Sequence, residues 1–346
     1  MMDNYIYILS QQSALLIERL HICTWSIEKD TYFTEYGLEI RRNQLKQIDI
    51  EMQLPLPNVL DGDNFKCLYN NIINVENCRF IFNADVKELS PINGKAPFGT
   101  RIDFKNDRKI TALPLELNEN IKINPKTNTL NITLDTSDDQ ITDTIYIRFL
   151  IKTKEPAFSF EKKEITRRII THEVRVNECR TASESVIKLQ KKNYETVLVN
   201  QCFCFHIIPH NYNIDFIDDK KLKTIRSLEA SGFNNYLGDL KDTFKLSLKE
   251  HDYNIIFCKQ ENSEKNKSKN YSFFSRYSKE YIGNVQIGIA IAVNILCSLL
   301  FAAGNLHEVD MELSFWCRMA IEYYFAFGIL ILLIIYLLHC RFWKKI

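Results

Sequence analysis

The chain has 346 residues, with 44 basic and 43 acidic side chains, a formal net charge of +1, and 46% hydrophobic residues. The charge balance excludes a protein that coats nucleic acid with a uniformly basic surface, and the apolar content excludes a disordered chain. With 10 glycines and 8 prolines, the composition also excludes collagen-like and other low-complexity proteins.

Residues 1–260 are expected to form a cytosolic, β-rich α+β domain that acts as a sensor. Short apolar runs alternate there with polar residues, as in Lys46–Leu56, where Ile48 and Ile50 share one face of a half-buried strand. No signal peptide is evident at the N-terminus, which agrees with a cytosolic domain. Two subdomains that meet near residues 156–163 are the alternative organisation.

Helices are predicted in only a few places within this domain. Aspartates suited to N-caps precede apolar residues in Asp63–Ile73 and in Asp218–Ala230. In the second segment, Leu222, Ile225 and Leu228 recur at helical spacing and predict a buried stripe.

Two cysteines and a histidine, Cys202, Cys204 and His206, are predicted to share one face of a strand. Thiolates and imidazoles bind zinc, but same-face side chains of a regular strand are roughly 6.6 Å apart. Tetrahedral zinc needs its sulfurs roughly 4 Å apart, so we interpret these residues as a buried apolar face. Phe203 and Phe205 then point the other way. No metal, cofactor or catalytic residue is predicted, and in the absence of a recognised catalytic motif the chain is not expected to be an enzyme.

Basic residues in two segments form the predicted phosphate-binding site. Arginine guanidinium groups suit phosphate oxygens because they form bidentate contacts. The alternative is a solvated strand and helix surface. The candidate residues are Arg167, Arg168, Arg175, Lys220, Lys221, Lys223 and Arg226.

Two apolar segments near the C-terminus are predicted to be transmembrane helices. Residues 281–303 carry no charge, and residues 319–340 carry one acid, Glu322. About 20 apolar residues are enough to cross a hydrocarbon core of ~30 Å as a helix. The sequence therefore predicts a C-terminal two-helix transmembrane hairpin.

The charges around these two segments predict their orientation. Basic residues are frequent in 261–280, which we interpret as a juxtamembrane linker, and in the tail, 341–346. The connector, 304–318, carries three acids and a single arginine at its end. Basic flanks stay on the cytoplasmic side, so both termini are expected in the cytoplasm and the protein in the plasma (inner) membrane.

One face of the first predicted span carries small and polar side chains at helical spacing. Amides inside a membrane need partners, so this face is expected to pack on the second span or to line a pore in an oligomer. The residues of this face are Gln286, Ala290, Asn294 and Cys297. In the pore interpretation the connector supplies an external acidic ring that favours cations. The residues of the ring are Glu308, Asp310 and Glu312.

The chain resembles a family of two-span membrane effectors in its layout. This layout is a β-rich cytosolic part, followed by spans at 281–303 and 319–340 that are joined by an acidic loop. Such effectors belong to bacterial nucleotidyltransferase-linked anti-phage defence systems, including the Hailong type. The resemblance implies a homo-oligomeric, ligand-gated pore-forming or membrane-disrupting effector that senses a nucleotide or oligonucleotide beside a partner nucleotidyltransferase. A membrane-anchored adaptor or scaffold, whose β-rich domain binds a protein partner, is the alternative.

Overall fold

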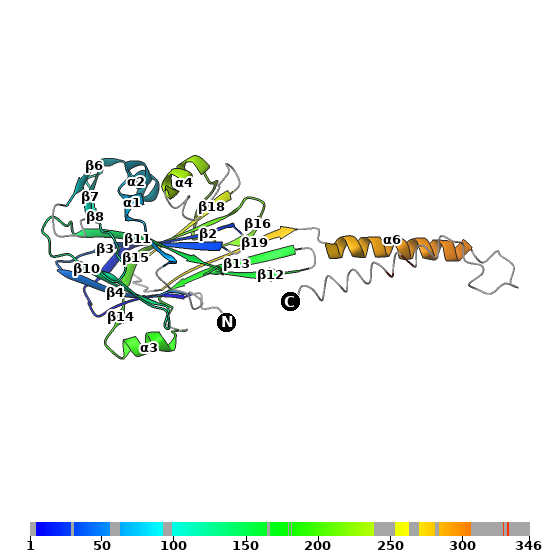
Figure 1. The fold of residues 1–346 in the computed structure, drawn as a ribbon, viewed down its shortest axis with the longest axis horizontal. Helices are drawn as coiled ribbons and strands as arrows, with labels where there is room; N and C mark the ends of the chain where they lie inside the picture. The colour runs from blue at the N-terminus through cyan, green and yellow to red at the C-terminus, as the bar shows by residue number, and fades with distance from the viewer. Residues whose placement is uncertain are drawn as a thin grey trace. The chain divides into compact units, whose positions relative to one another are not determined.

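The fold is seen in a computed structural model (Figure 1). The residues that it describes are 5–28, 31–55, 63–92, 99–164, 167–178, 180, 182–238, 253–262, 270–280, 284–305, 328 and 331. The chain divides into two compact units. The first unit is Met1–Glu161 with Ile170–Tyr277, and the second is Lys162–Ile169 with Ser278–Ile346.

The described strands form two mixed sheets, and the first of them has nine strands. In the order of pairing, its strands are β16 (Asn213–Ile217), β19 (Tyr271–Glu280), β13 (Arg167–Val176), β1 (Tyr5–Ser10), β4 (Gln47–Gln53), β10 (Thr129–Asp135) and β9 (Ile121–Asn124), with β12 (Ser159–Lys163) on β13 and β14 (Glu195–Thr196) on β1.

The second sheet has ten strands among the described residues. Its order is β17 (Leu222–Ser227), β18 (Tyr253–Glu261), β15 (Leu198–Pro209), β2 (Leu16–Glu28), β3 (Thr31–Arg41), β11 (Thr144–Thr153), β8 (Lys109–Ala112), β7 (Thr100–Phe104) and β6 (Val86–Pro91), with β5 (Phe65–Cys67) on β11. The described helices are α1 (Tyr69–Ile72), α2 (Val75–Phe82), α3 (Glu184–Gln190), α4 (Ala230–Leu237) and α6 (Asn284–Asn305).

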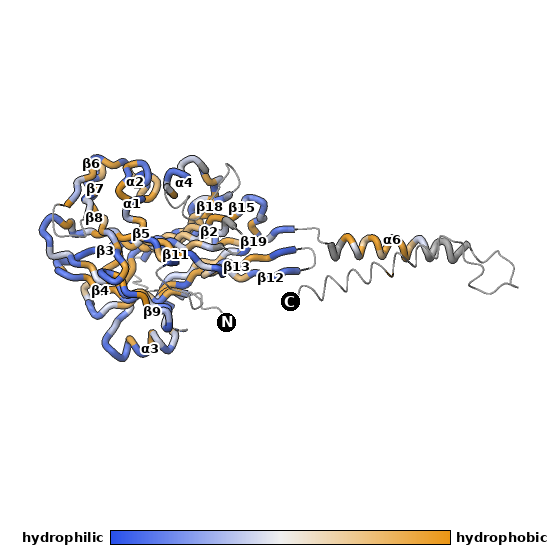
Figure 2. Tube along the Cα trace, viewed as in Figure 1, coloured by the Kyte–Doolittle hydropathy of each residue, from blue (hydrophilic) through white to orange (hydrophobic). Residues whose placement is uncertain are grey.

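The main hydrophobic core draws buried side chains from both sheets. Ile50 of β4 and Ile132 of β10 belong to the same buried cluster as Leu38 of β3 and Ile147 of β11. The burial of alternate residues along β4 confirms the strand predicted there. Figure 2 shows hydrophobic residues following the inner strands of the two-sheet unit. The central strands of both sheets thus bury one face in this core, and the ten-stranded sheet is left with a second face.

Short helices cover part of that second face (Figure 1). Phe233 of α4 packs edge-on against Trp25 of β2, and Phe82 of α2 packs edge-on against Tyr146 of β11. Asn74 is the N-cap of α2, and its side chain accepts hydrogen bonds from two backbone N–H groups of the first turn. These helices leave β15, β18 and β17 incompletely covered, and the candidate site lies there.

The segment Asp218–Ala230 contains β17, so the helix predicted there is wrong. The register of β17 against β18 shifts between Leu222 and Thr224, which marks a β-bulge. Leu222 and Ile225 pair with Cys258 and Ile256, and therefore lie on one face although they are three residues apart. The bulge gave the apolar residues of β17 the three-residue spacing that is typical of a helix.

The strand β19 covers Tyr271–Glu280, half of the segment 261–280 for which a linker is predicted. Its side chains alternate between the core and solvent, with Tyr271, Phe273 and Tyr277 buried. These residues pair with β16 and β13 in the nine-stranded sheet. This part of the segment is a sheet strand with period-two burial from Tyr271 to Tyr277, in spite of its charged residues.

The part of the chain that the structure describes contains no helix both long and apolar enough to span a membrane. The helix α6 occupies most of 281–303, the first of the two segments predicted to span the membrane. The predicted fold class, a β-rich α+β domain followed by a two-helix transmembrane hairpin, is therefore wrong: the described part of the chain is β-rich, with two mixed sheets and few helices. Plasma-membrane localisation and the membrane-protein and ion-channel assignments are not supported either.

Candidate functional site

A groove with a volume of about 610 Å³ lies on the second face of the ten-stranded sheet. Strands β2, β15, β18 and β17 contribute its floor and one rim, and the end of α2 contributes another part of its wall. This volume is within the range of sites that bind small molecules and cofactors.

The pairing of the strands places three phenylalanine rings together in the floor. Phe203 and Phe205 alternate along β15, and Phe257 of β18 pairs directly with Phe205. The rings of Phe205 and Phe257 stack with centroids 4.5 Å apart and planes within 6° of each other. Phe203 meets Phe257 edge-on at 5.7 Å. All three rings are only partly buried, so they offer apolar surface to a ligand.

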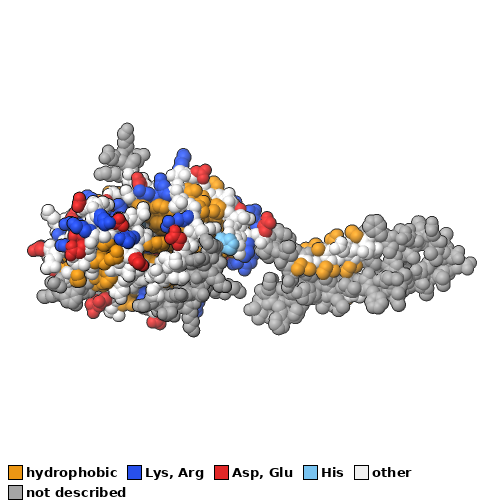
Figure 3. Space-filling view, turned by 90° about the horizontal axis from the view of Figure 1, so that it is seen from above, with side chains coloured by type: hydrophobic (Ala, Val, Ile, Leu, Met, Phe, Trp, Pro, Cys, Tyr) orange, Lys and Arg blue, Asp and Glu red, His pale blue; other side chains and the backbone are white. Residues whose placement is uncertain are grey.

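Four basic residues surround this aromatic floor, and no aspartate or glutamate is among its described lining residues. Arg19 lies 3.7 Å from Glu39, and Lys259 is paired with Glu261. Figure 3 shows basic side chains beside exposed hydrophobic ones on the face that carries α2 and α4.

The other two basic residues, Lys223 and Arg226, are exposed on β17. Within the described ranges neither forms an ion pair with a carboxylate. The bulge in β17 places Thr224 and Arg226 on the face of Phe257 and Ile255, which is the groove face. The groove therefore combines stacked aromatic rings with two cations that have no counter-charge in the described structure.

A buried polar network lies in the sheet next to the groove. Arg148 of β11 donates from Nε to Glu35 of β3 at 2.9 Å, and its Nη2 also contacts that carboxylate. Tyr236 of α4 donates to the same Glu35 oxygen at 2.8 Å. Burial raises the pKa of Glu35, whereas Arg148 and Tyr236 act in the opposite direction. This network ties α4 to the sheet through Glu35 Oε2, whereas Glu35 Oε1 is buried without a hydrogen-bond partner in the described structure.

Gly37 of β3 provides the space that this network needs. It pairs with Arg148 on one side and with His21 of β2 on the other. A Cβ atom at this position would overlap the hydroxyl of Tyr146, which receives a hydrogen bond of 2.9 Å from Arg148 Nη1. Glycine is therefore required here by close approach across the sheet.

We expect Gly37→Ala to destabilise the protein by about 1–3 kcal/mol, because overpacking must displace Tyr146 or Arg148. Gly232 in α4 is the matched control, since an added Cβ there meets no atom within 4 Å. Gly232→Ala is expected to be neutral or stabilising by up to about 1 kcal/mol. Urea unfolding of both variants measures the difference, and equal stability for the two would show that the space at Gly37 is not needed.

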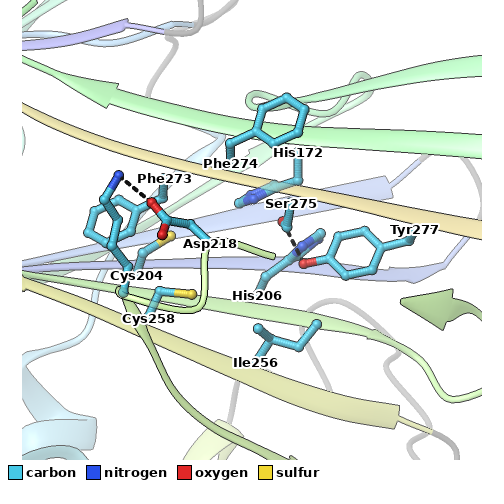
Figure 4. Close-up of a pocket in the computed structure, with 11 residues that line it drawn as sticks. His172, Cys204, His206, Asp218, Ile256, Cys258, Phe273, Phe274, Ser275 and Tyr277 are labelled. Atoms are coloured by element: carbon cyan, nitrogen blue, oxygen red, sulfur yellow. Dashed lines mark hydrogen bonds and ion pairs between the residues drawn. The ribbon is translucent and has the colours of Figure 1, made fainter. Parts of the chain in front are cut away.

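A second, much smaller hollow lies between the sheets (Figure 4). The rings of His172 and His206 stack there with centroids 3.8 Å apart. Burial lowers the pKa of His172 to about 3 and that of His206 well below its usual value, so both rings are neutral at pH 7. The volume of about 10 Å³ is at most that of one water molecule, which excludes a ligand site here.

The cysteines and the histidine of β15 share one buried face of the strand, as the alternation of side chains predicted. Cys202, Cys204 and His206 are buried between the sheets, and Phe203 and Phe205 lie in the floor of the groove on the other face. Burial raises the pKa values of both thiols. In the described ranges no group of three or more histidine, cysteine or acidic side chains is arranged to hold a metal ion.

The predicted phosphate-binding residues do not form one site. Of the lysines and the arginine in 220–226, only Lys223 and Arg226 line the groove. Lys221 pairs with Asp218 at 2.9 Å, and Lys220 is exposed outside the groove.

The three arginines of β13 lie elsewhere. Arg175 is engaged with Glu173 and with the Tyr5 hydroxyl in the nine-stranded sheet. Arg167 and Arg168 belong to the second unit, in which Arg167 donates to Ser278 at 2.7 Å. These three residues are therefore not part of the groove.

The predicted pore face and acidic ring are only partly described. Ala290, Asn294 and Cys297 are exposed on α6, and the Gln286 side chain lies outside the described residues. The acidic-ring residues Glu308, Asp310 and Glu312 also lie outside them, as do 341–346 and, apart from Gly328 and Ile331, 319–340.

Sequence reasoning did not find most of the groove. Arg19 and Lys259 are more than 200 residues apart, and strand pairing alone brings them to one face. Two signals were available: the alternation that points Phe203 and Phe205 away from the buried cysteines, and the cluster of basic residues that contains Lys223 and Arg226. Neither indicated that the rings and these cations would lie in the same groove.

Comparisons with known proteins do not assign a family. No family model and no curated protein matches the chain. A solved structure from Parabacteroides distasonis ATCC 8503, described as a candidate protease, is 8% identical with a TM-score of 0.28, over 82% of this chain and 43% of that one. A homology model of the full-length AP-3 complex in an intermediate open conformation is 8% identical with a TM-score of 0.19, over 82% and 53%. The chain spans about half the length of these proteins, and likenesses this weak carry no argument.

Proposed function

We propose that the two-sheet unit is a sensor module that binds a nucleotide or short oligonucleotide in the groove. The observation that supports this proposal is the aromatic floor of Phe203, Phe205 and Phe257 beside two cations without counter-charge, Lys223 and Arg226. Stacking surface and phosphate-binding charge are the two features that a nucleotide needs from a protein.

The base and the phosphate of such a ligand each have a suitable partner in the groove. A base that stacks on a phenylalanine ring gains about 1–3 kcal/mol by the measure of alanine substitution. The guanidinium of Arg226 suits two phosphate oxygens, and Lys223 adds a point charge three residues away. The near-zero net charge of the chain does not oppose this proposal, because the described lining of the groove contains four basic and no acidic residues.

The homo-oligomer, the partner nucleotidyltransferase and the role in anti-phage defence remain part of the proposal. Their support is the β-rich part of the resemblance alone, because the described part of the structure contains no helix that could span a membrane. A protein-binding adaptor is the competing function. The described lining of the groove suits a small anion better than a protein surface, so it does not favour this alternative. The binding test below separates the two.

We expect the full-length protein to bind AMP, GMP, CMP, UMP or a tetranucleotide, with an affinity that falls as salt rises. Arg226→Glu is expected to weaken binding at least tenfold, because it replaces a phosphate contact with a repulsive charge. Lys220→Glu is the matched control: it makes the same charge change six residues away on a side chain outside the groove, and a change of less than about threefold is expected. Isothermal titration calorimetry measures both constants.

Two results of that titration would contradict the proposal. The absence of binding for all five ligands would leave the adaptor function as the better account of the groove. Equal losses for Arg226→Glu and Lys220→Glu would show that any nucleotide binding is a general effect of surface charge. A loss confined to Arg226→Glu supports binding in the groove.

A further inference from the structure

A second hollow, with a volume of about 320 Å³, adjoins the groove and is lined by α2, α4 and the residues at their ends. It shares three lining residues with the groove: Phe80, Asn83 and Arg226. The other lining residues of this hollow, which we call the α2–α4 pocket, are Glu76, Asn77, Arg79, Glu229, Gly232 and Asn235. The groove and the α2–α4 pocket therefore meet at Arg226, one of the two cations proposed to hold the phosphate.

The α2–α4 pocket has a lining of a different chemical kind from the aromatic floor of the groove. Two carboxylates, Glu76 and Glu229, lie in it, and within the described ranges neither forms an ion pair. Its own arginine, Arg79, lies 3.4 Å from Asp85 outside the pocket. Two carboxylates repel a second phosphate, so the pocket suits a neutral polar group that is attached to the phosphate at Arg226.

Three side chains of this pocket are open to a ligand and are not used by the fold. Asn83, Glu229 and Asn235 are exposed, and in the part of the chain that the structure describes their side chains form no hydrogen bond. Glu229 is the N-cap of α4, yet its side chain makes no capping hydrogen bond. The donors and acceptors of these three residues are therefore available on the side of Arg226 that faces away from the aromatic floor.

Amides and carboxylates suit the hydrogen-bonding edge of a nucleic-acid base. A carboxylate accepts from the amino group of cytosine, and an asparagine amide pairs with the amino group and N7 of adenine. Uracil has carbonyl oxygens instead of an amino group, and carboxylates repel them. The ring of Phe80, which is 37% exposed and packs against Tyr236 with centroids 5.7 Å apart, adds an aromatic surface for a base.

We infer that the α2–α4 pocket is a second base subsite, which selects a base with an exocyclic amino group. The first base stacks on the aromatic floor of the groove, and the phosphodiester lies at Lys223 and Arg226. The second base lies against Glu229 and Asn235. This inference rests on the proposed function and extends it, because the ligand then contains at least two nucleosides joined by a phosphodiester.

Three dinucleoside monophosphates measure the base preference of this subsite on the full-length protein. UpC, CpU and UpU carry the same single phosphate, and cytosine differs from uracil in the amino group at C4. UpC and CpU cover both orders of the bases along the ligand. We expect the tighter of these two to bind about tenfold more tightly than UpU in isothermal titration calorimetry, because a hydrogen bond to a charged carboxylate is gained.

Two variants locate this preference within the molecule. Glu229→Gln keeps the size of the side chain but can also donate to uracil, so we expect the tenfold ratio to fall to about twofold or less. Gly232→Leu fills the pocket from α4, where an added Cβ meets no atom within 4 Å, and leucine favours a helix more than glycine does. We expect Gly232→Leu to reduce the ratio to about one.

Ser231→Leu is the matched control for the filling of the pocket. It adds the same side chain one residue earlier on α4, at an exposed position that lines neither hollow. We expect this variant to keep the tenfold preference for cytosine. A cytosine preference that is lost in Gly232→Leu and retained in Ser231→Leu supports a base subsite in the α2–α4 pocket.

The other outcomes separate this inference from the proposed function. If mononucleotides bind but UpC and CpU bind no more tightly than UpU, the proposed function stands and the inference is wrong. A cytosine preference that persists in both Glu229→Gln and Gly232→Leu arises elsewhere and also overturns the inference. If neither mononucleotides nor dinucleotides bind, both the proposed function and the inference fail.

Discussion

Replacement of Arg148 with methionine is expected to lower the free energy of unfolding by about 3–5 kcal/mol. Arg148 is 8% exposed and Glu35 is 1% exposed, so the substitution leaves a carboxylate buried without its counter-charge. Tyr146 and Tyr236 also lose the guanidinium to which they are bonded. Urea unfolding at pH 7 measures the loss.

A double substitution identifies the cause of that loss. Arg148→Met combined with Glu35→Leu removes both charges, and we expect it to recover most of the stability. Arg175→Met is the matched control, because the Arg175–Glu173 pair is partly exposed and is worth under about 1 kcal/mol. If the double variant is as unstable as the single one, the uncompensated charge of Glu35 is not the reason.

The second large effect is a loss of stability in mild acid. His21, His172 and His206 are buried, and burial lowers all three pKa values in the folded protein. Below pH ~6.5 the unfolded chain binds protons that the folded chain does not, so the free energy of unfolding falls as the pH falls. Each histidine contributes up to about 1.4 kcal/mol per pH unit, and for His172 this continues down to its folded pKa of about 3.

Unfolding in urea at pH 7.5, 6.0 and 5.0 measures this dependence. Glu35 opposes it above pH ~4.5, because burial raises its pKa and its folded form then binds the extra proton. We expect a net slope of about 3 kcal/mol per pH unit at the acid end of this range. His172→Gln keeps a polar atom near Thr24 and should reduce the slope by about 1.4 kcal/mol per pH unit. Stability that does not change between pH 7.5 and 5.0 would mean that these histidines are protonated in the folded state.

The alternation of apolar residues was enough to predict several strands, because burial of one strand face leaves a period of two in the sequence. It located β4 in Lys46–Leu56 and the two faces of β15. The same rule failed at β17, where a bulge at Leu222 changed the period to three. It also failed for Tyr271–Glu280, where charged residues on the solvent face resembled a linker.

The groove and the C-terminal segments show why sequence was not sufficient. The order β17–β18–β15–β2 arises from pairing over long sequence distances, which no local pattern encodes. Lys223 and Arg226 were found because lysines and arginines cluster there. Arg167, Arg168 and Arg175, which were predicted to share their site, do not line the groove. The length of the apolar run at 281–303 predicted a membrane span, which the described part of the structure does not support.

The most direct test of the central proposal is photo-crosslinking of a short oligonucleotide that contains 5-bromouridine to the full-length protein, followed by peptide mapping. A base stacked in the groove crosslinks to the ring beside it. The proposal predicts adducts on Phe203, Phe205 or Phe257 that disappear in Arg226→Glu and persist in Lys220→Glu. Adducts confined to other parts of the chain, or adducts that Arg226→Glu leaves unchanged, would contradict nucleotide binding in the groove.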